Sequence, residues 1–183
     1  MIISGCATFS KKEFRSRFLK VELSNRNQFN GKYSFYAKRS LGLMIHDSIM
    51  NKINLYQEIV NEPQGIHDVV LQNLDDEKDY FVKIEWYHQD SVLIALYEED
   101  QMIRDTALSG IWKKGVFYMD NRFLECNGIP YLLGGCNHNK RRLVFTSESN
   151  LIVNTAVSNE GAFLFLIGSG YRMNRYIEFE KLN

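Results

Sequence analysis

Four histidines could in principle bind a metal or transfer protons: His46, His67, His88 and His138. They fall in four different predicted elements, and no two of them have the short spacing typical of a metal site. Gly168-Ser169-Gly170 lies between two predicted strands and therefore lacks the strand-turn-helix setting of a nucleophile elbow. The sequence predicts no catalytic residue, no metal and no cofactor, and we expect a protein that is not an enzyme.

Two polar or aromatic side chains are better placed to hold a ligand. Trp86 alternates with Lys83 and Glu85 and so lies on the dry face of its strand. Arg175 falls on the buried face of the last predicted strand, where its planar guanidinium suits the two oxygens of a carboxylate. With their apolar neighbours, the candidate ligand-binding residues are Val82, Ile84, Trp86, Met173, Arg175 and Ile177.

The N-terminal residues Ile3-Ser4-Gly5-Cys6 match the pattern in which one apolar and two small residues precede the lipid-modified cysteine of bacterial lipoproteins. A secretory signal also needs a charged segment and an apolar segment. Lipidation of Cys6 therefore requires a true start upstream of Met1. Two interpretations stay open: a lipid-anchored protein of the bacterial cell envelope, in contact with the membrane through that lipid, or a cytoplasmic protein with an ordinary thiol.

The remaining cysteines, Cys126 and Cys136, enclose a loop of hairpin size. In an oxidising compartment they could form a disulfide. Two separate buried thiols are the alternative, because free cysteine is among the residues most often buried.

Composition favours a β fold. Of 183 residues 13% are aromatic and two are proline, which suits strands with half-buried faces. Lysine plus arginine equals aspartate plus glutamate at 22 each, so no net field attracts nucleic acid. The basic cluster Lys140-Arg141-Arg142 is short, and we expect it on a solvated face or turn. The longest apolar stretch, Ala162–Ile167, is too short for a transmembrane helix.

The pattern along the chain predicts two helical segments and many strands. A capping box at Ser10 begins a helix that ends near Asn25, and apolar residues at steps of three and four predict helix between Leu41 and Val60. The strands are predicted from alternation with a period of two residues and from the turn residues between them. The predicted strands are 29–37, about 82–86, 91–98, 102–109, 111–119, 122–126, 141–146, 151–157, 162–167 and 171–179.

Consecutive strands joined by short turns suit a sandwich or an up-and-down barrel. We favour the barrel, because closure removes the edges of a large open sheet. The predicted fold is mainly β: a single antiparallel up-and-down β-barrel of about 8–10 strands, with a short N-terminal helix and a helical segment after the first strand. Residues 1–25 form the anchor and short helix, and residues 26–183 form the barrel domain.

The first strand carries Phe29-x-Gly31-x-Tyr33, which resembles the glycine-x-tryptophan opening of lipocalins with Tyr in place of Trp. The chain is also similar to lipocalin-like lipoproteins of bacterial envelopes. The resemblance implies a calycin barrel in which a basic residue of the last strand lies across the aromatic residue of the first. Here that structural clasp would join Arg175 to Tyr33.

These observations lead to one expected function and one alternative. We expect a non-enzymatic, lipid-anchored envelope protein whose barrel binds a small hydrophobic ligand. The alternative is a structural or protein-docking module that uses the barrel exterior or the Leu41–Val60 helix, with an unknown partner.

Overall fold

The computed structural model describes residues 7–9, 23–41, 53–60, 74–75, 77–129, 133–163 and 167–183. Cys6, residues 10–22 of the predicted N-terminal helix and residues 42–52 of the predicted second helix lie outside these ranges. Within the described part of the chain, no helix is long and apolar enough to cross a membrane.

Ten strands and two short helical elements make up the described structure. The helical elements are the 3-10 helix η1 (Leu23–Phe29) and the α-helix α2 (Leu55–Val60). The strands are β1 (Gly31–Ser34), β2 (Arg39–Ser40), β3 (Tyr80–His88), β4 (Ser91–Glu98), β5 (Gln101–Lys113), β6 (Val116–Met119), β7 (Phe123–Ile129), β8 (Leu133–Phe145), β9 (Leu151–Phe163) and β10 (Ile167–Phe179). The prediction of a mainly β, antiparallel domain is confirmed.

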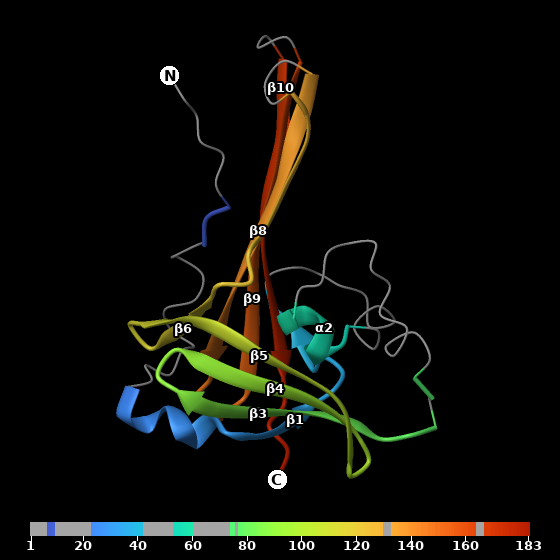
Figure 1. The fold of residues 1–183 in the computed structure, drawn as a ribbon, viewed down its shortest axis with the longest axis vertical. Coiled ribbons are helices and arrows are strands. Elements are labelled where there is room, and N and C mark those ends of the chain that lie inside the picture. The colour runs from blue at the N-terminus through green and yellow to red at the C-terminus, as the bar shows by residue number, and fades with distance from the viewer. Residues whose placement is uncertain are drawn as a thin grey trace.

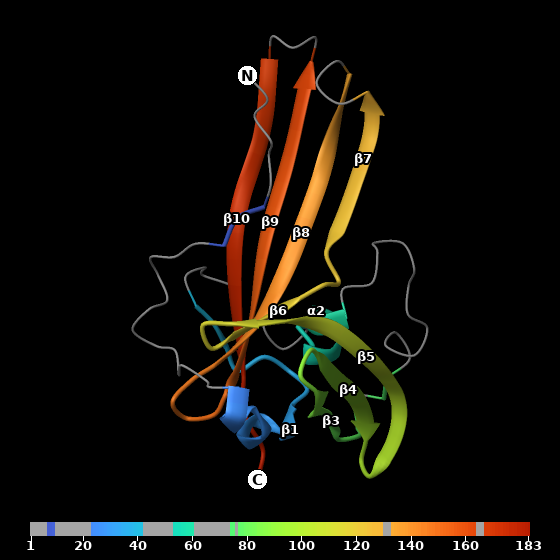
Figure 2. The same cartoon turned by 60° about the vertical axis from the view of Figure 1, so that its left-hand side comes forward.

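All strand pairs are antiparallel, and the strand order in the sheet is β1-β3-β4-β5-β6-β8-β9-β10-β2, with β7 on β8 beside β6. The sheet has two parts (Figures 1 and 2). A body contains η1, α2, β1 to β6 and the C-terminal end of the chain. From it β7 rises together with the far halves of β8, β9 and β10 as a long projecting sheet.

The sheet is not closed into a barrel, so this part of the prediction is wrong. Its two end strands, β1 and β2, belong to one stretch of chain that is interrupted between them. There Phe35 accepts a backbone bond from Leu55, and Ala37 donates one to Ile53. Because these backbone groups bond to the segment that begins α2, the first strand cannot form one continuous ladder.

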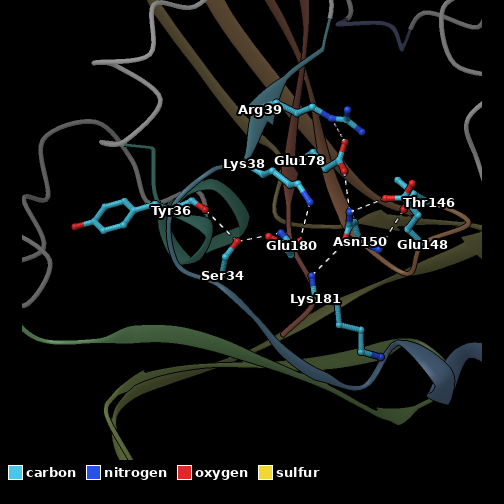
Figure 3. Close-up of polar contacts among 10 residues, drawn as sticks. All are labelled: Ser34, Tyr36, Lys38, Arg39, Thr146, Glu148, Asn150, Glu178, Glu180 and Lys181. Carbon is cyan, nitrogen blue, oxygen red and sulfur yellow. Dashed lines mark hydrogen bonds and ion pairs between the residues drawn. The ribbon is translucent and has the colours of Figure 1, made fainter. Parts of the chain in front are cut away.

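Separate backbone hydrogen bonds nevertheless join residues 32–41 to residues 176–182. We call the region where these two segments meet the seam (Figure 3). Ser34 N–H donates to Glu180 O and Leu182 N–H donates to Lys32 O, on either side of a bridge between Tyr33 and Lys181. The buried Glu178 carboxylate accepts bonds from Arg39 and Asn150. The seam therefore holds the two ends of the open sheet next to each other.

The core lies on the inner face of the curved body. Its main cluster combines inward side chains of β1, β3 to β6 and β8 to β10 with Phe29 and with Leu55, Tyr56 and Ile59 of α2. A second cluster on the outer face contains Val116, Val144, Ile152 and Tyr176. Residues 141–146 and 150–156 are consequently buried on both faces of the sheet.

Several predicted turns are in fact strand interiors. Strands 102–109 and 111–119 were expected to be separate, but β5 runs through Gly110 and the chain turns at Lys114 and Gly115. Both turn residues have positive φ (55° and 78°), as a tight type I′ hairpin requires. Gly110 is glycine for another reason: a Cβ there would lie 2.4 Å from the carbonyl oxygen of Tyr118.

Gly110→Ala should therefore lower the free energy of unfolding by about 1–3 kcal/mol, because the new methyl group meets backbone that cannot move away. Urea unfolding followed by tryptophan fluorescence measures the change. Ser109→Ala, an exposed position in the same strand, is the control and should shift stability by less than about 0.5 kcal/mol. Equal stability of the two variants would contradict the close approach of Gly110 to the backbone of Tyr118.

Candidate functional site

Three polar side chains form one row across the inner face of the sheet. The strand register pairs Arg141 of β8 with Thr155 of β9, and Thr155 with Arg175 of β10. We call these three residues the arginine row. Two residues further along each strand, on the same face, lie Leu143, Val153 and Ile177, which belong to the main core. The arginine row is thus the polar edge of the apolar interior.

Helix α2 brings one carboxylate to this row. Both oxygens of Glu58 accept bonds from Nη2 of Arg175, each at 2.6 Å. The helix has six residues, too few to be stable alone. Its start is tied to Phe35 and Ala37 by backbone bonds, and the side-chain amide of Asn121 donates to the carbonyls of Ile59 and Val60 at its end.

The arginine row holds more buried donors than acceptors. Arg141 is 8% exposed and Thr155 2% exposed. Within the described part of the chain, the Nε atoms of Arg141 and Arg175 and the hydroxyl of Thr155 are buried and have no hydrogen-bond partner. Arg141 donates from Nη1 to the neutral side-chain oxygen of Asn139. Buried polar groups without partners are rare in folded proteins, so this concentration makes the row a candidate binding site.

The electrostatic environment of Arg141 supports the same interpretation of the arginine row. Burial lowers the pKa of Arg141 to about 10, the Glu58 carboxylate opposes this shift, and the neighbouring Arg175 adds to it. Arg141 therefore stays charged at neutral pH. The half-buried Arg175 bonds to the Glu58 carboxylate, whereas the buried Arg141 has no hydrogen bond to a carboxylate among the described residues.

The adjacent residue, Arg142, has a different environment. It points to the outer face, where Nε donates to Asn154 at 2.6 Å and its guanidinium lies over the ring of Phe9. Residues 7–9 are held on this face, since Ala7 N–H donates to Nδ1 of His138. Burial, together with Lys140 and Arg122, lowers the pKa of His138 and so favours the neutral ring that accepts this bond. The basic cluster was expected to be solvated, but in the structure it is part of β8, where Arg141 and Arg142 are buried and Lys140 is half-buried.

A group of aromatic side chains lies below the arginine row on the inner face. Trp86 packs against Trp112 and Phe117, with ring centroids 4.9 Å and 4.7 Å apart. The indole N–H groups of Trp86 and Trp112 are buried and have no acceptor. We call these three residues the indole cluster.

The candidate ligand-binding residues are split between two strands of the body. Val82, Ile84 and Trp86 lie on β3, while Met173, Arg175 and Ile177 lie on β10. All but Met173 and Arg175 belong to the main core, which side chains fill. Met173 is half-buried and lies one step beyond Arg175, on the projecting sheet.

Arg175 does not lie beside Tyr33. The residue paired with Tyr33 is Lys181, six positions further along the chain, which at ~3.3 Å per residue is roughly 20 Å away. Lys181 Nζ donates to the carbonyl of Gln28 in η1, and its side chain passes close to Gly31. The hydroxyl of Tyr33 donates to the carbonyl of Phe29, and burial raises its pKa. The basic residue at the first strand is therefore Lys181.

Cys126 and Cys136 are bonded as a disulfide between paired positions of β7 and β8. The link lies on the projecting sheet, and Cys126 is exposed. Cys6 lies outside the described residues. Among the described residues, no group of three or more histidine, cysteine, aspartate or glutamate side chains is placed to hold a metal ion.

Sequence reasoning missed Arg141, Thr155 and Trp112 as site residues. A signal for Arg141 existed, because any strand over 141–146 places Arg141 on the face of Leu143 and Phe145. No sequence signal could align Thr155 between the two arginines, since this depends on the register of three strands. Glu58 falls within the predicted helix between Leu41 and Val60, but no sequence signal pairs it with Arg175.

Comparison of the chain with models of known protein families, with curated proteins and with solved structures finds no match in any of the three. The function proposed below therefore rests on the geometry of the chain itself.

Glu58→Gln should lower the free energy of unfolding by about 2 kcal/mol, because it removes the carboxylate that binds the half-buried Arg175 and that favours the charged form of the buried Arg141. Chemical denaturation at neutral pH measures the loss. Glu180→Gln is the matched control: it breaks the exposed pair with Lys38 and should cost less than about 0.5 kcal/mol. If both variants lose the same stability, Glu58 does not balance the positive charge of the arginine row.

Proposed function

We propose that this chain is a non-enzymatic protein of the bacterial cell envelope that binds a small, mostly apolar ligand on the inner face of its sheet. A lipid on Cys6 anchors it to the membrane. The observation that carries the binding proposal is the indole cluster, in which two buried N–H donors lack an acceptor within an aromatic environment.

Buried indole N–H groups usually find a hydrogen-bond partner. Leaving one unsatisfied costs about 1–3 kcal/mol, so an acceptor that satisfies it contributes a comparable amount to binding. Trp112 is only half-buried, so it provides the approach from solvent. A ligand with an apolar body and one carbonyl, ether or hydroxyl oxygen matches this environment.

The open sheet keeps one lipocalin-like feature. The seam brings the first strand against the end of the last one, and Lys181 links that end to η1. In this proposal the ligand binds on the inner face of the sheet whose two ends the seam holds together.

The envelope location has independent support. A disulfide between Cys126 and Cys136 persists in oxidising compartments such as the bacterial periplasm and is rare in the cytosol. In the described part of the Leu41–Val60 helix, Leu55, Tyr56 and Ile59 of α2 are buried in the core, so these three side chains do not support docking. Docking through the outer surface stays a prediction.

The binding proposal is tested on protein purified from its own host without detergent. Native mass spectrometry should detect a bound apolar molecule, and delipidated protein should rebind it with a change in tryptophan fluorescence. Trp112→Phe keeps an aromatic side chain, although a smaller one, but removes the N–H donor and should weaken binding about 5- to 100-fold. Tyr87→Phe, an exposed change on β3, should leave the affinity unchanged. A protein that carries no apolar molecule would overturn the proposal.

The anchor is tested by expressing the natural gene in its host with a radiolabelled fatty acid. The wild-type protein should carry the label and sediment with membranes. Cys6→Ala should lose both properties, whereas Cys126→Ala should keep them. Label retained in Cys6→Ala would rule out this attachment site.

A further inference from the structure

We propose that the arginine row of Arg141, Thr155 and Arg175 is a binding site for a monoanionic carboxylate. This is a second site, separate from the indole cluster, and it stands whether or not the indoles bind a ligand. The structure places two guanidinium groups on either side of a hydroxyl on one face of the sheet, and all three side chains have a buried donor atom without a partner.

The charge balance determines the ligand charge. The two arginines carry two positive charges, and Glu58 supplies one negative charge, through Arg175. Arg141 forms its one hydrogen bond with a neutral amide. A buried charge without a counter-ion is strongly unfavourable, so one further anion is the simplest partner for Arg141.

Water alone does not meet this requirement. An ordered water could accept bonds from the orphan donors but would leave the net positive charge. A carboxylate supplies both the charge and two acceptor oxygens, which match the planar fork of a guanidinium. A phosphate dianion would bring one charge too many. The chemistry therefore favours a monocarboxylate.

The surroundings allow two sources for that carboxylate. Solvent reaches the row through Arg175, whose side chain is 28% exposed. Below the row, roughly 7 Å along the strands, lie the apolar side chains of Leu143, Val153 and Ile177. The carboxylate could belong to a small free acid that fills only the row, or to the head of an amphipathic acid whose chain meets these residues.

The experiment uses the full chain and three probes in chloride-free buffer: acetate, octanoate and the uncharged octanol. Isothermal titration calorimetry should show saturable binding of octanoate and none of octanol. Acetate that competes with octanoate assigns the site to small free acids, whereas binding of octanoate alone assigns it to amphipathic acids. No saturable binding of either carboxylate overturns the proposal.

Variants separate a binding role from a structural one. Arg141→Gln should weaken carboxylate binding about 10- to 100-fold and leave the ligand-free protein at least as stable. Thr155→Val removes one donor at nearly constant volume and should weaken binding less. Arg172→Gln, an exposed loss of the same charge on β10, should change the affinity less than about twofold. Equal affinities in Arg141→Gln and Arg172→Gln would contradict the site.

Discussion

Burial of β8 and β9 on both faces is the constraint on which the rest of the structure depends. Residues 141–146 and 150–156 have the main core on one side and the smaller outer cluster on the other. Every polar side chain in these segments must therefore find a partner inside the protein. On the outer face Arg142 and Asn154 do so, through each other and through the Arg175 carbonyl. On the inner face, buried donor atoms of Arg141 and Thr155 have no partner among the described residues, and the candidate anion site lies there.

The position of Glu58 shows how the body supports that site. Its helix is too short to persist alone, and its ends are held by backbone bonds to residues 35–37 and by Asn121. The bonds that hold α2 are the same ones that interrupt the first strand. An open sheet and a carboxylate bonded to Arg175 are thus two consequences of one local arrangement. The seam then keeps the interrupted strand against β10 (Figure 3).

The projecting sheet differs from the body in composition and in exposure. Its strands carry glycine, asparagine and serine on both faces, and Leu124 and Tyr171 are exposed. Continuous backbone ladders hold it together, with the disulfide between β7 and β8. This explains why 158–161 and 168–170 were wrongly predicted as turns. Turn-type residues can occupy a strand wherever neither face needs apolar side chains.

The sequence by itself determined the β class, the limits of β4 and the inner face on which Val82, Ile84 and Trp86 lie. These follow from the two-residue period of an extended chain, which is a local property. The tertiary structure decided the strand register, the interruption at 35–37 and the approach of Glu58. It also decided that Lys181, and not Arg175, lies beside Tyr33. These features depend on residues far apart in sequence, because buried backbone and charged groups take whichever partners the packed chain brings near them.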